Sequence, residues 1–179
     1  MSDFDELLRR NQAFAQSGAK DRVPAIPFIP NRQVYTLTCI DPRVDPAQLF
    51  GLDLGDAIVA RTVGGRVTPA VLQDLAWISY LHETKTPDAD WFEVAVMHHT
   101  DCGSGFFADD GLRHEFAARG GYDDAELAAL AVLDPAQTVP VDVARVLDSP
   151  LVSPRIQVTG LAYDVKTGLV TTVVPPQSR

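Results

Sequence analysis

Two cysteines and one histidine in this 179-residue chain have the types and spacing that suit metal chemistry. His99 and Cys102 are separated by two residues, which suits two ligands on one tight turn, and Cys39 lies far upstream. Zinc takes thiolate and imidazole ligands in tetrahedral sites, and a structural zinc site usually has four protein ligands. Because the chain has only two cysteines, we expect one Zn²⁺ per chain with three such ligands and a fourth position open to water or substrate.

A carboxylate and a guanidinium stand beside the first of these ligands, at Asp41 and Arg43. Arg43 can hold Asp41 in a bidentate ion pair. Asp41 then has two possible roles: it accepts a hydrogen bond from water at the metal, or it turns round and becomes the fourth ligand. Both residues are therefore catalytic candidates, and Asp41 is also a candidate metal ligand. Zinc with two thiolates and a neutral imidazole is formally uncharged, so we expect activity to rise toward alkaline pH.

Simpler structural explanations stay open for the same residues. The two cysteines could form one disulfide or fill apolar space, and His99 could be an ordinary core histidine. Asp41 and Arg43 could form an ion pair with no catalytic role. His98 precedes His99 in a predicted strand, so its side chain should point to the opposite side and be structural. Asp101 is expected to cap the following turn, and two further histidines are expected at the surface, His82 and His114.

The elements that must bring the candidate ligands together are predicted from the hydrophobic pattern. Runs rich in β-branched and aromatic residues predict four strands and a hairpin partner, at residues 34–39, 57–62, 92–98, 156–163 and 169–174. Helical patterns cover residues 3–16, 46–50, 69–82, 104–119, 123–133 and 137–147. This alternation predicts an α/β fold: a mostly parallel four-stranded sheet with an added antiparallel C-terminal edge strand and helices on both faces.

The predicted strands place the candidate ligands at one edge of the sheet. Cys39 ends the first strand, and His99 and Cys102 follow the end of the third. In open parallel sheets, bound molecules lie beyond the carboxyl ends of the strands. The three side chains therefore meet if the first and third strands are neighbours.

Length and composition indicate one globular domain over residues 1–179. Apolar residues make up 46% and charged residues 22% of the chain, which is ordinary for a soluble protein. Residues 1–31 are expected to form a helical and Pro-rich arm that lies across something else, such as another subunit. The net charge of −9 argues against a nucleic-acid or membrane partner and favours a small-molecule ligand. The acidic N-terminus and the few cysteines predict a cytoplasmic protein.

Two motifs resemble those of the β-class carbonic anhydrases: Cys39-x-Asp41-x-Arg43 and His99-x-x-Cys102-Gly103. The segment 55–65 is similar to the family's second strand and glycine turn, and the segment 160–168 resembles its terminal hairpin. Together these matches span most of residues 34–174. One departure is Arg61-Thr62-Val63-Gly64, where the family commonly has Arg-Asn-Ala-Gly, so one local hydrogen-bond role is left unassigned.

The resemblance implies a carbonate dehydratase, a zinc lyase that reversibly hydrates CO₂ to bicarbonate through zinc-bound hydroxide. It implies Cys39, His99 and Cys102 as zinc ligands and Asp41 with Arg43 as the catalytic dyad. It also implies a homodimer or a dimer of dimers, with the N-terminal helix packed on the neighbouring subunit. Two alternatives stay open: hydrolysis of carbonyl sulfide or carbon disulfide on the same zinc scaffold, and a zinc- or bicarbonate-binding regulator without turnover.

Overall fold

The computed structural model describes residues 3–23 and 29–179, and the strands of this part of the chain form a single sheet. The strand order is β2-β1-β3-β4-β5. Strands β1 to β4 run parallel and β5 runs antiparallel to β4, as predicted. The bounds are β1 Val34–Cys39, β2 Ala57–Thr62, β3 Glu93–His99, β4 Gln157–Asp164 and β5 Leu169–Gln177.

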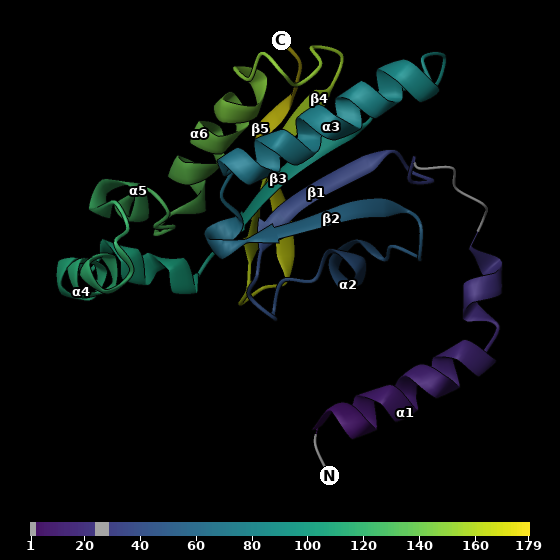
Figure 1. Cartoon of the computed structure of the whole chain (residues 1–179), viewed down its shortest axis with the longest axis horizontal. Helices are drawn as coiled ribbons and strands as arrows, with labels where there is room; N and C mark the ends of the chain where they lie inside the picture. The colour runs from purple at the N-terminus through teal and green to yellow at the C-terminus, as the bar shows by residue number, and fades with distance from the viewer. Residues whose placement is uncertain (1–2, 24–28) are drawn as a thin grey trace.

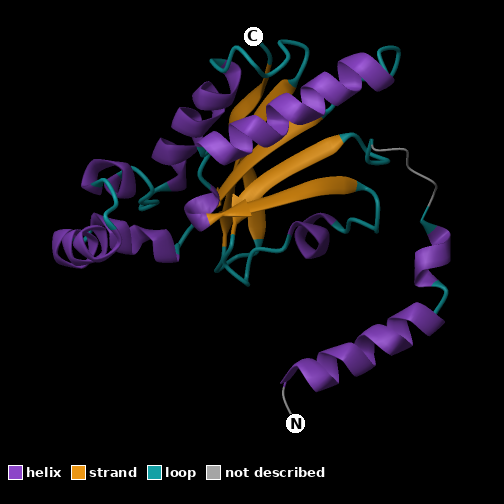
Figure 2. Cartoon of the chain, in the orientation of Figure 1, coloured by secondary structure: helices purple, strands orange, loops and turns teal. Residues whose placement is uncertain are grey.

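The helices surround this sheet, most of them where the sequence pattern predicts them (Figures 1 and 2). The α-helices are α1 Asp3–Gln16, α2 Pro46–Phe50, α3 Pro69–Lys85, α4 Asp110–Gly120, α5 Asp124–Ala128 and α6 Pro135–Leu147. Three short 3₁₀ segments are η1 Ala19–Arg22, η2 Val63–Gly65 and η3 Gly103–Ala108.

Two helical predictions need correction. The helix predicted over residues 104–119 is divided into η3 and α4, because the Asp109 carboxylate accepts a hydrogen bond from the Leu112 backbone N–H and caps a new helix there. The helix predicted over residues 123–133 is only the short α5, which ends at Ala128. The chain then continues as a loop toward α6, whose N-cap is Asp134.

Apolar side chains cover both faces of the sheet. On the face beneath α3 and α6, the core includes Leu37, Val96 and Val158 together with apolar residues of the two helices. Because side chains alternate along a strand, Met97 points to the opposite face. There it packs with Val44 and Tyr163, and Leu49 of α2 lies against them. Burial on two faces fixes the register of the strands and therefore the positions of the residues at their carboxyl ends.

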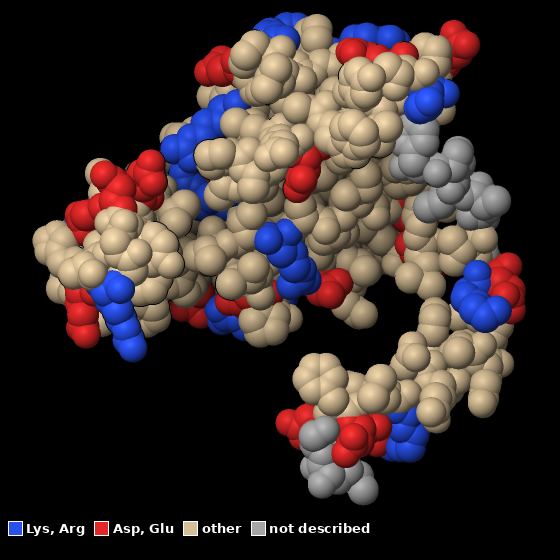
Figure 3. Space-filling view, in the orientation of Figure 1, with Lys and Arg blue, Asp and Glu red and all other residues tan. Residues whose placement is uncertain are grey.

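The N-terminal helix α1 extends away from the sheet (Figure 1). None of its described residues is buried, and the large apolar side chains of Phe4, Leu7, Leu8 and Phe14 are exposed. The predicted arm over residues 1–31 is thus seen in part, because residues 1–2 and 24–28 lie outside the described residues. Among the described residues, no helix is long and apolar enough to cross a membrane. Figure 3 shows acidic and basic side chains interspersed on one face of the molecule.

Candidate metal centre

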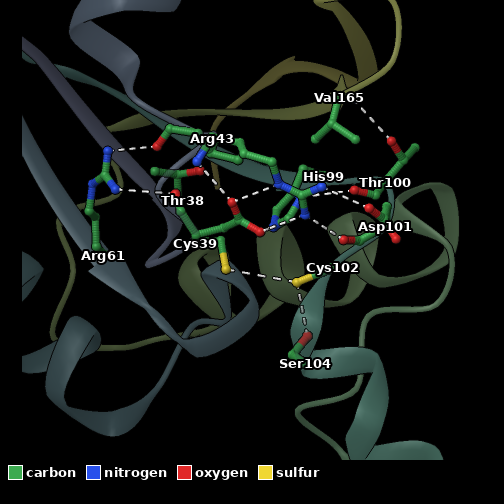
Figure 4. A network of polar contacts seen from close by, with 12 residues as sticks. Thr38, Cys39, Arg43, Arg61, His99, Thr100, Asp101, Cys102, Ser104 and Val165 are labelled. Atoms are coloured by element: carbon green, nitrogen blue, oxygen red, sulfur yellow. Dashed lines mark hydrogen bonds and ion pairs between the residues drawn. The ribbon is translucent and has the colours of Figure 1, made fainter.

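The carboxyl ends of β1 and β3 bring the three predicted ligands together. These two strands are neighbours, with Leu37 paired to Val96. Cys39 ends β1, His99 ends β3, and Cys102 follows on the next turn. One ligand atom from each of the three residues lies within 4.8 Å of the others. The expectation that they meet at one edge of the sheet is confirmed, and Figure 4 shows the cluster.

The distance between the two sulfur atoms suits a shared metal ion. The Sγ atoms of Cys39 and Cys102 are 3.8 Å apart, which is far longer than a disulfide bond of about 2.05 Å. Two thiolates on one tetrahedral zinc, each at about 2.3 Å from the metal, would be separated by about 3.8 Å. Both cysteines are free, so the disulfide explanation is wrong.

The imidazole of His99 is oriented so that one nitrogen is left for a metal. Its Nδ1–H donates to the Thr100 carbonyl oxygen at 2.9 Å, because a carbonyl can only accept. That hydrogen bond leaves the lone pair on Nε2. Nε2 is buried and has no hydrogen-bond partner, which is unfavourable unless a ligand meets it. The donor set and this unpartnered nitrogen therefore fit a zinc ion.

The two thiols differ in acidity, and a residue that sequence reasoning missed contributes to the difference. A hydrogen bond from Cys39, supported by the Ser104 hydroxyl 3.2 Å away, lowers the pKa of Cys102 to about 6. The hydrogen bond to Cys102 and burial raise the pKa of Cys39 to about 12. Ser104 stabilises the thiolate form of Cys102, which is the form that binds metals.

Asp41 lies beside the cluster in a bidentate ion pair with Arg43. Nε of Arg43 donates to Oδ1 of Asp41 at 3.0 Å, Nη2 donates to Oδ2 at 2.8 Å, and the Arg43 backbone N–H donates to Oδ1 at 2.8 Å. These bonds hold the pKa of Asp41 at about 2. Oδ2 of Asp41 is 3.9 Å from Nε2 of His99. The carboxylate is therefore ionised and within reach of a group bound at the cluster.

Asp101 has a different role from the predicted turn cap. Its carboxylate accepts a hydrogen bond from Nη1 of Arg43 at 2.7 Å, and its backbone carbonyl accepts one from Nη2 at 2.8 Å. The following short helix, η3, has no side-chain cap. The sequence around Arg43 and Asp101 does not indicate their contact, because the contact depends on the pairing of β1 with β3.

Two glycines let the turn after β2 approach the candidate ligands. Gly65 has φ +70°, and a Cβ atom there would lie 2.8 Å from the Met97 carbonyl oxygen and 3.1 Å from the backbone nitrogen of Cys39. Gly64 has φ +71°, and its Cβ would lie 2.8 Å from the Ser104 hydroxyl. No larger residue fits either position without displacing the backbone or Ser104. In the same turn, the Thr62 hydroxyl donates to the Arg66 carbonyl oxygen at 2.8 Å.

A cleft opens onto the cluster and is lined mainly by apolar groups. Its volume is about 600 Å³. Its lining includes Cys39 and Asp41 of the site and aromatic side chains of η3 and α4. The principal apolar lining residues are Ile40, Val63, Phe106, Phe107, Leu112 and Phe116. Such a cleft suits a small neutral molecule that reaches a charged centre.

The other histidines lie outside this cluster. His98 points to the other side of β3, as predicted, and its Nδ1 lies 2.7 Å from the Thr138 hydroxyl. His114 is exposed, as predicted. His82 was expected at the surface, but it is fully buried, because α3 continues to Lys85 and the ring packs edge-on against Trp91 at 4.4 Å between centroids.

A buried ion pair behind the site was also missed by sequence reasoning. Asp142 of α6 is completely buried and accepts hydrogen bonds from Nε and Nη2 of Arg66 at 2.5 and 3.4 Å and from Arg145 at 3.0 Å. Nε2 of His98 lies 3.1 Å from the same carboxylate. Arg66 also donates to the carbonyl oxygens of Ala129 and Ala131. The network joins α6, β3 and the turn that carries Gly64.

Comparisons with known proteins agree with this geometry. A family model described as "Carbonic anhydrase" matches residues 34–115, which include all five predicted site residues. The crystal structure of carbonic anhydrase from Streptococcus mutans is 32% identical, covers 97% of this chain and 98% of its own, and has a TM-score of 0.76. Beta-carbonic anhydrase 1 of Mycobacterium tuberculosis is 29% identical over 175 residues, 98% of this chain and 100% of its own length.

Relatives named for another activity are also found. Carbon disulfide hydrolase from Acidianus sp. is 26% identical over an alignment of 192 positions, which covers 92% of this chain and 85% of that protein. The fold and the Cys-His-Cys cluster define an α/β protein with a candidate zinc centre at the carboxyl edge of a mostly parallel sheet. Because the match to the Streptococcus mutans protein covers nearly all of both chains at 32% identity, the protein belongs to the β-carbonic anhydrase family.

Proposed function

We propose that this protein is a carbonate dehydratase that uses one zinc ion per chain to hydrate CO₂ reversibly to bicarbonate. The observation that carries the proposal is the ionised Asp41, held by Arg43, 3.9 Å from the unpartnered Nε2 of a Cys-His-Cys cluster. Membership of the β-carbonic anhydrase family supports the same reaction. A purely structural metal site needs no such carboxylate beside it.

The zinc ion would be held by Cys39, His99 and Cys102. When bound, zinc supplies a Lewis acid that lowers the pKa of water and so provides a nucleophile near neutral pH. The Thr100 carbonyl fixes the His99 ring so that Nε2 faces the metal. Ser104 supports Cys102 as a thiolate.

The protein's own residues orient and select the reactants. Asp41 accepts a hydrogen bond from the attacking water and fixes its direction, while Arg43 keeps the carboxylate ionised and in place. The apolar cleft admits a neutral linear substrate and excludes bulk water. Asp41 is also the proposed fourth zinc ligand of a resting form, in which it has left Arg43 and closed the site to water.

The proposal is tested by measuring zinc content and CO₂ hydration together. The purified chain should bind about one zinc ion, and stopped-flow hydration should require it. Cys102→Ser should lose most of the zinc and the activity, while the exposed control Asp88→Asn, in the loop before β3, should keep both. A Cys102→Ser variant with full zinc and full activity would refute the proposed ligand set.

A second candidate reaction is hydrolysis of carbonyl sulfide or carbon disulfide. It is favoured by the similarity to carbon disulfide hydrolases and by the apolar walls of the cleft. Linear sulfur-containing substrates are close in shape to CO₂, so the ligand set does not discriminate between them. A comparison of kcat/KM for CO₂ and carbonyl sulfide decides, and a clear preference for the sulfur compound would overturn the first choice. Zinc-loaded protein without turnover of either would indicate a zinc- or bicarbonate-binding regulator.

The proposed assembly is a homodimer or a dimer of dimers in which α1 packs on a neighbouring subunit. The support is the row of exposed apolar side chains, including Phe4, Leu7 and Leu8, on a helix that extends away from the sheet and has no buried residue among those described. Exposed apolar surface of this kind usually marks an interaction site.

We further propose that residues 1–179 form one domain and act in the cytoplasm. The single sheet to which the described helices α3 and α6 contribute core residues supports one domain. A zinc site with two thiolates suits a compartment in which thiols stay reduced. Limited proteolysis that released a stable fragment within residues 29–179 would contradict the first point, and fractionation of the native host cells tests the second.

A further inference from the structure

Arg43 is held by a second acidic residue besides Asp41. Its Nη1 donates to Oδ2 of Asp101 at 2.7 Å, and its Nη2 donates to the Asp101 carbonyl oxygen at 2.8 Å. Nε and Nη2 donate to Asp41. The guanidinium is thus fixed on two edges by oxygen atoms of two different loops, and Figure 4 shows Asp101 on the far side of Arg43 from the sheet strand that carries Cys39.

The backbone of Asp101 has the left-handed conformation that few side chains accept. Its φ is +54°, and among the described residues only Gln33 is another non-glycine residue with positive φ. Asp and Asn tolerate this region better than most residues. Asp101 stands between His99 and Cys102, so the same strained turn carries two candidate ligands and the two Asp101 oxygens that accept from Arg43. Strain of this kind is characteristic of functional sites.

The contact links the two loops from which the site is built. Arg43 follows β1 and Asp101 follows β3, and 58 sequence positions separate them. The Arg43 side chain is 47% exposed, so a single ion pair with Asp41 would be weakened by solvent and by the many rotamers of arginine. A second anchor on the ligand turn removes those rotamers and fixes the edge of the guanidinium that faces Asp41.

We propose that Asp101 is a positioning residue: it holds Arg43 in the orientation that retains Asp41 and so keeps Asp41 away from the fourth ligand position. The inference deepens the proposed function and rests on its assignment of Asp41. Asp101 itself does not touch the reacting groups. It acts through Arg43, and it favours the form of the site in which Asp41 is paired with Arg43 and is not a metal ligand.

Two substitutions separate this role from a general effect on folding. Asp101→Asn keeps the left-handed preference and an oxygen acceptor but loses the charge, and Asp101→Gly keeps the backbone conformation and carbonyl contact but loses the side chain. Asp88→Asn, in the exposed loop before β3, is the matched control for net charge. Thermal unfolding of each variant shows whether the fold is preserved.

The test measures the position of Asp41 and the rate of CO₂ hydration in zinc-loaded protein. Crystal structures should show Asp41 paired with Arg43 in the wild type and the control, and moved toward the metal in part of the Asp101→Gly molecules. We expect kcat/KM to fall about tenfold in Asp101→Gly, which loses the side-chain hydrogen bond to Arg43, and less in Asp101→Asn, which loses only the acceptor's charge.

The inference is overturned if Asp41 stays paired with Arg43 in both variants, whatever happens to the rate. It is equally overturned if kcat/KM stays within about twofold of the wild type although the side chain is gone, since a lost charge-assisted bond should cost more. If Asp101→Gly fails to fold, the same two readouts on Asp101→Asn decide. Wild-type zinc protein that does not hydrate CO₂ would refute the proposed function instead, and the crystallographic position of Asp41 would still test the inference.

Discussion

The Sγ atoms of Cys39 and Cys102 lie 3.8 Å apart although 63 sequence positions separate the two residues. Neighbouring parallel strands create this proximity, because Cys39 ends β1 and Cys102 follows β3. The separation is that of two thiolates on one tetrahedral zinc and not that of a disulfide. The site is therefore built by the fold and not by a local sequence motif alone.

Removal of the metal should lower the stability of the protein reversibly. A ligand that binds only the folded state stabilises it by about 4 kcal/mol when present at about 1,000 times its Kd. For a domain of this size, such a loss should lower Tm by roughly 8–16 °C. Thermal unfolding with and without a chelator measures the effect, and added zinc should restore Tm. Cys39→Ser should show no zinc-dependent shift; an equal shift in that variant would place the metal elsewhere.

Loss of the Asp41–Arg43 pair should reduce the rate of turnover strongly and should reduce zinc binding less. In Asp41→Asn the charge that orients the attacking water is absent, and we expect kcat/KM to fall roughly 100-fold. Arg43→Lys keeps the charge but not the bidentate geometry, so an intermediate loss is expected. Stopped-flow kinetics and zinc analysis on the same samples check both statements. Retention of full kcat/KM by both variants would support a structural ion pair.

The activity should rise toward alkaline pH through a group other than Asp41. Because Arg43 holds the pKa of Asp41 at about 2, that carboxylate is fully ionised across the neutral range. The zinc with two thiolates is less acidifying than a three-histidine site, so the midpoint should lie between about 7 and about 9. A pH profile of kcat/KM from pH 6 to 10 tests this, and a profile that is flat or falls over this range would contradict it.

The sequence predicts features that depend on neighbouring residues better than features that depend on contacts between distant parts of the chain. The bounds of β1, β2, α1 and α2 agree with the prediction because apolar runs, caps and prolines are local signals. The candidate ligands Cys39, His99 and Cys102 could be predicted to meet because strand ends in a parallel sheet converge. The contact of Asp101 with Arg43 and the pair Arg66–Asp142 were missed, since the partners lie 58 and 76 positions apart and meet only through strand register and helix docking. His82 was misplaced because burial by Trp91 follows from packing and not from helical periodicity.

The buried Asp142 should make a large contribution to stability at neutral pH. Burial opposes its ionisation, but contacts with His98 and Arg66 outweigh burial and lower the pKa of the carboxyl. Asp142→Asn leaves the Arg66 charge without its counter-ion in the interior, which typically costs about 3–5 kcal/mol. Urea unfolding at pH 7 measures this loss, and the exposed Asp88→Asn should change stability by less than about 0.5 kcal/mol.

The Asp142 carboxylate should also make the stability of the protein sensitive to acid. A group whose pKa is lowered on folding stabilises the folded state above its unfolded pKa, about 3.9 for Asp. That contribution is lost as the pH falls from about 4 through the folded pKa. Wild-type stability should therefore decrease between pH 5 and pH 3 more steeply than that of Asp142→Asn. Parallel slopes for the two proteins would show that Asp142 is not responsible.

The exposed apolar residues of α1 should control assembly. Replacement of Leu7 and Leu8 by Ser removes apolar surface from a helix that buries nothing within its own chain. Size-exclusion chromatography with light scattering should show a homodimer or larger for the wild type and a weaker assembly for the double variant. Control substitutions at the exposed Leu151 should have no effect. An unchanged mass for the Leu7 and Leu8 variant would place the interface elsewhere.

The most direct test of the central claim is stopped-flow CO₂ hydration by one preparation measured as purified, after zinc removal and after zinc is restored. We predict hydration with about one zinc ion per chain, its loss in the metal-free protein, and its recovery on remetallation in the wild type but not in Cys102→Ser. Hydration that persists without zinc, or zinc-loaded wild-type protein that does not hydrate CO₂ from neutral to alkaline pH, would contradict it.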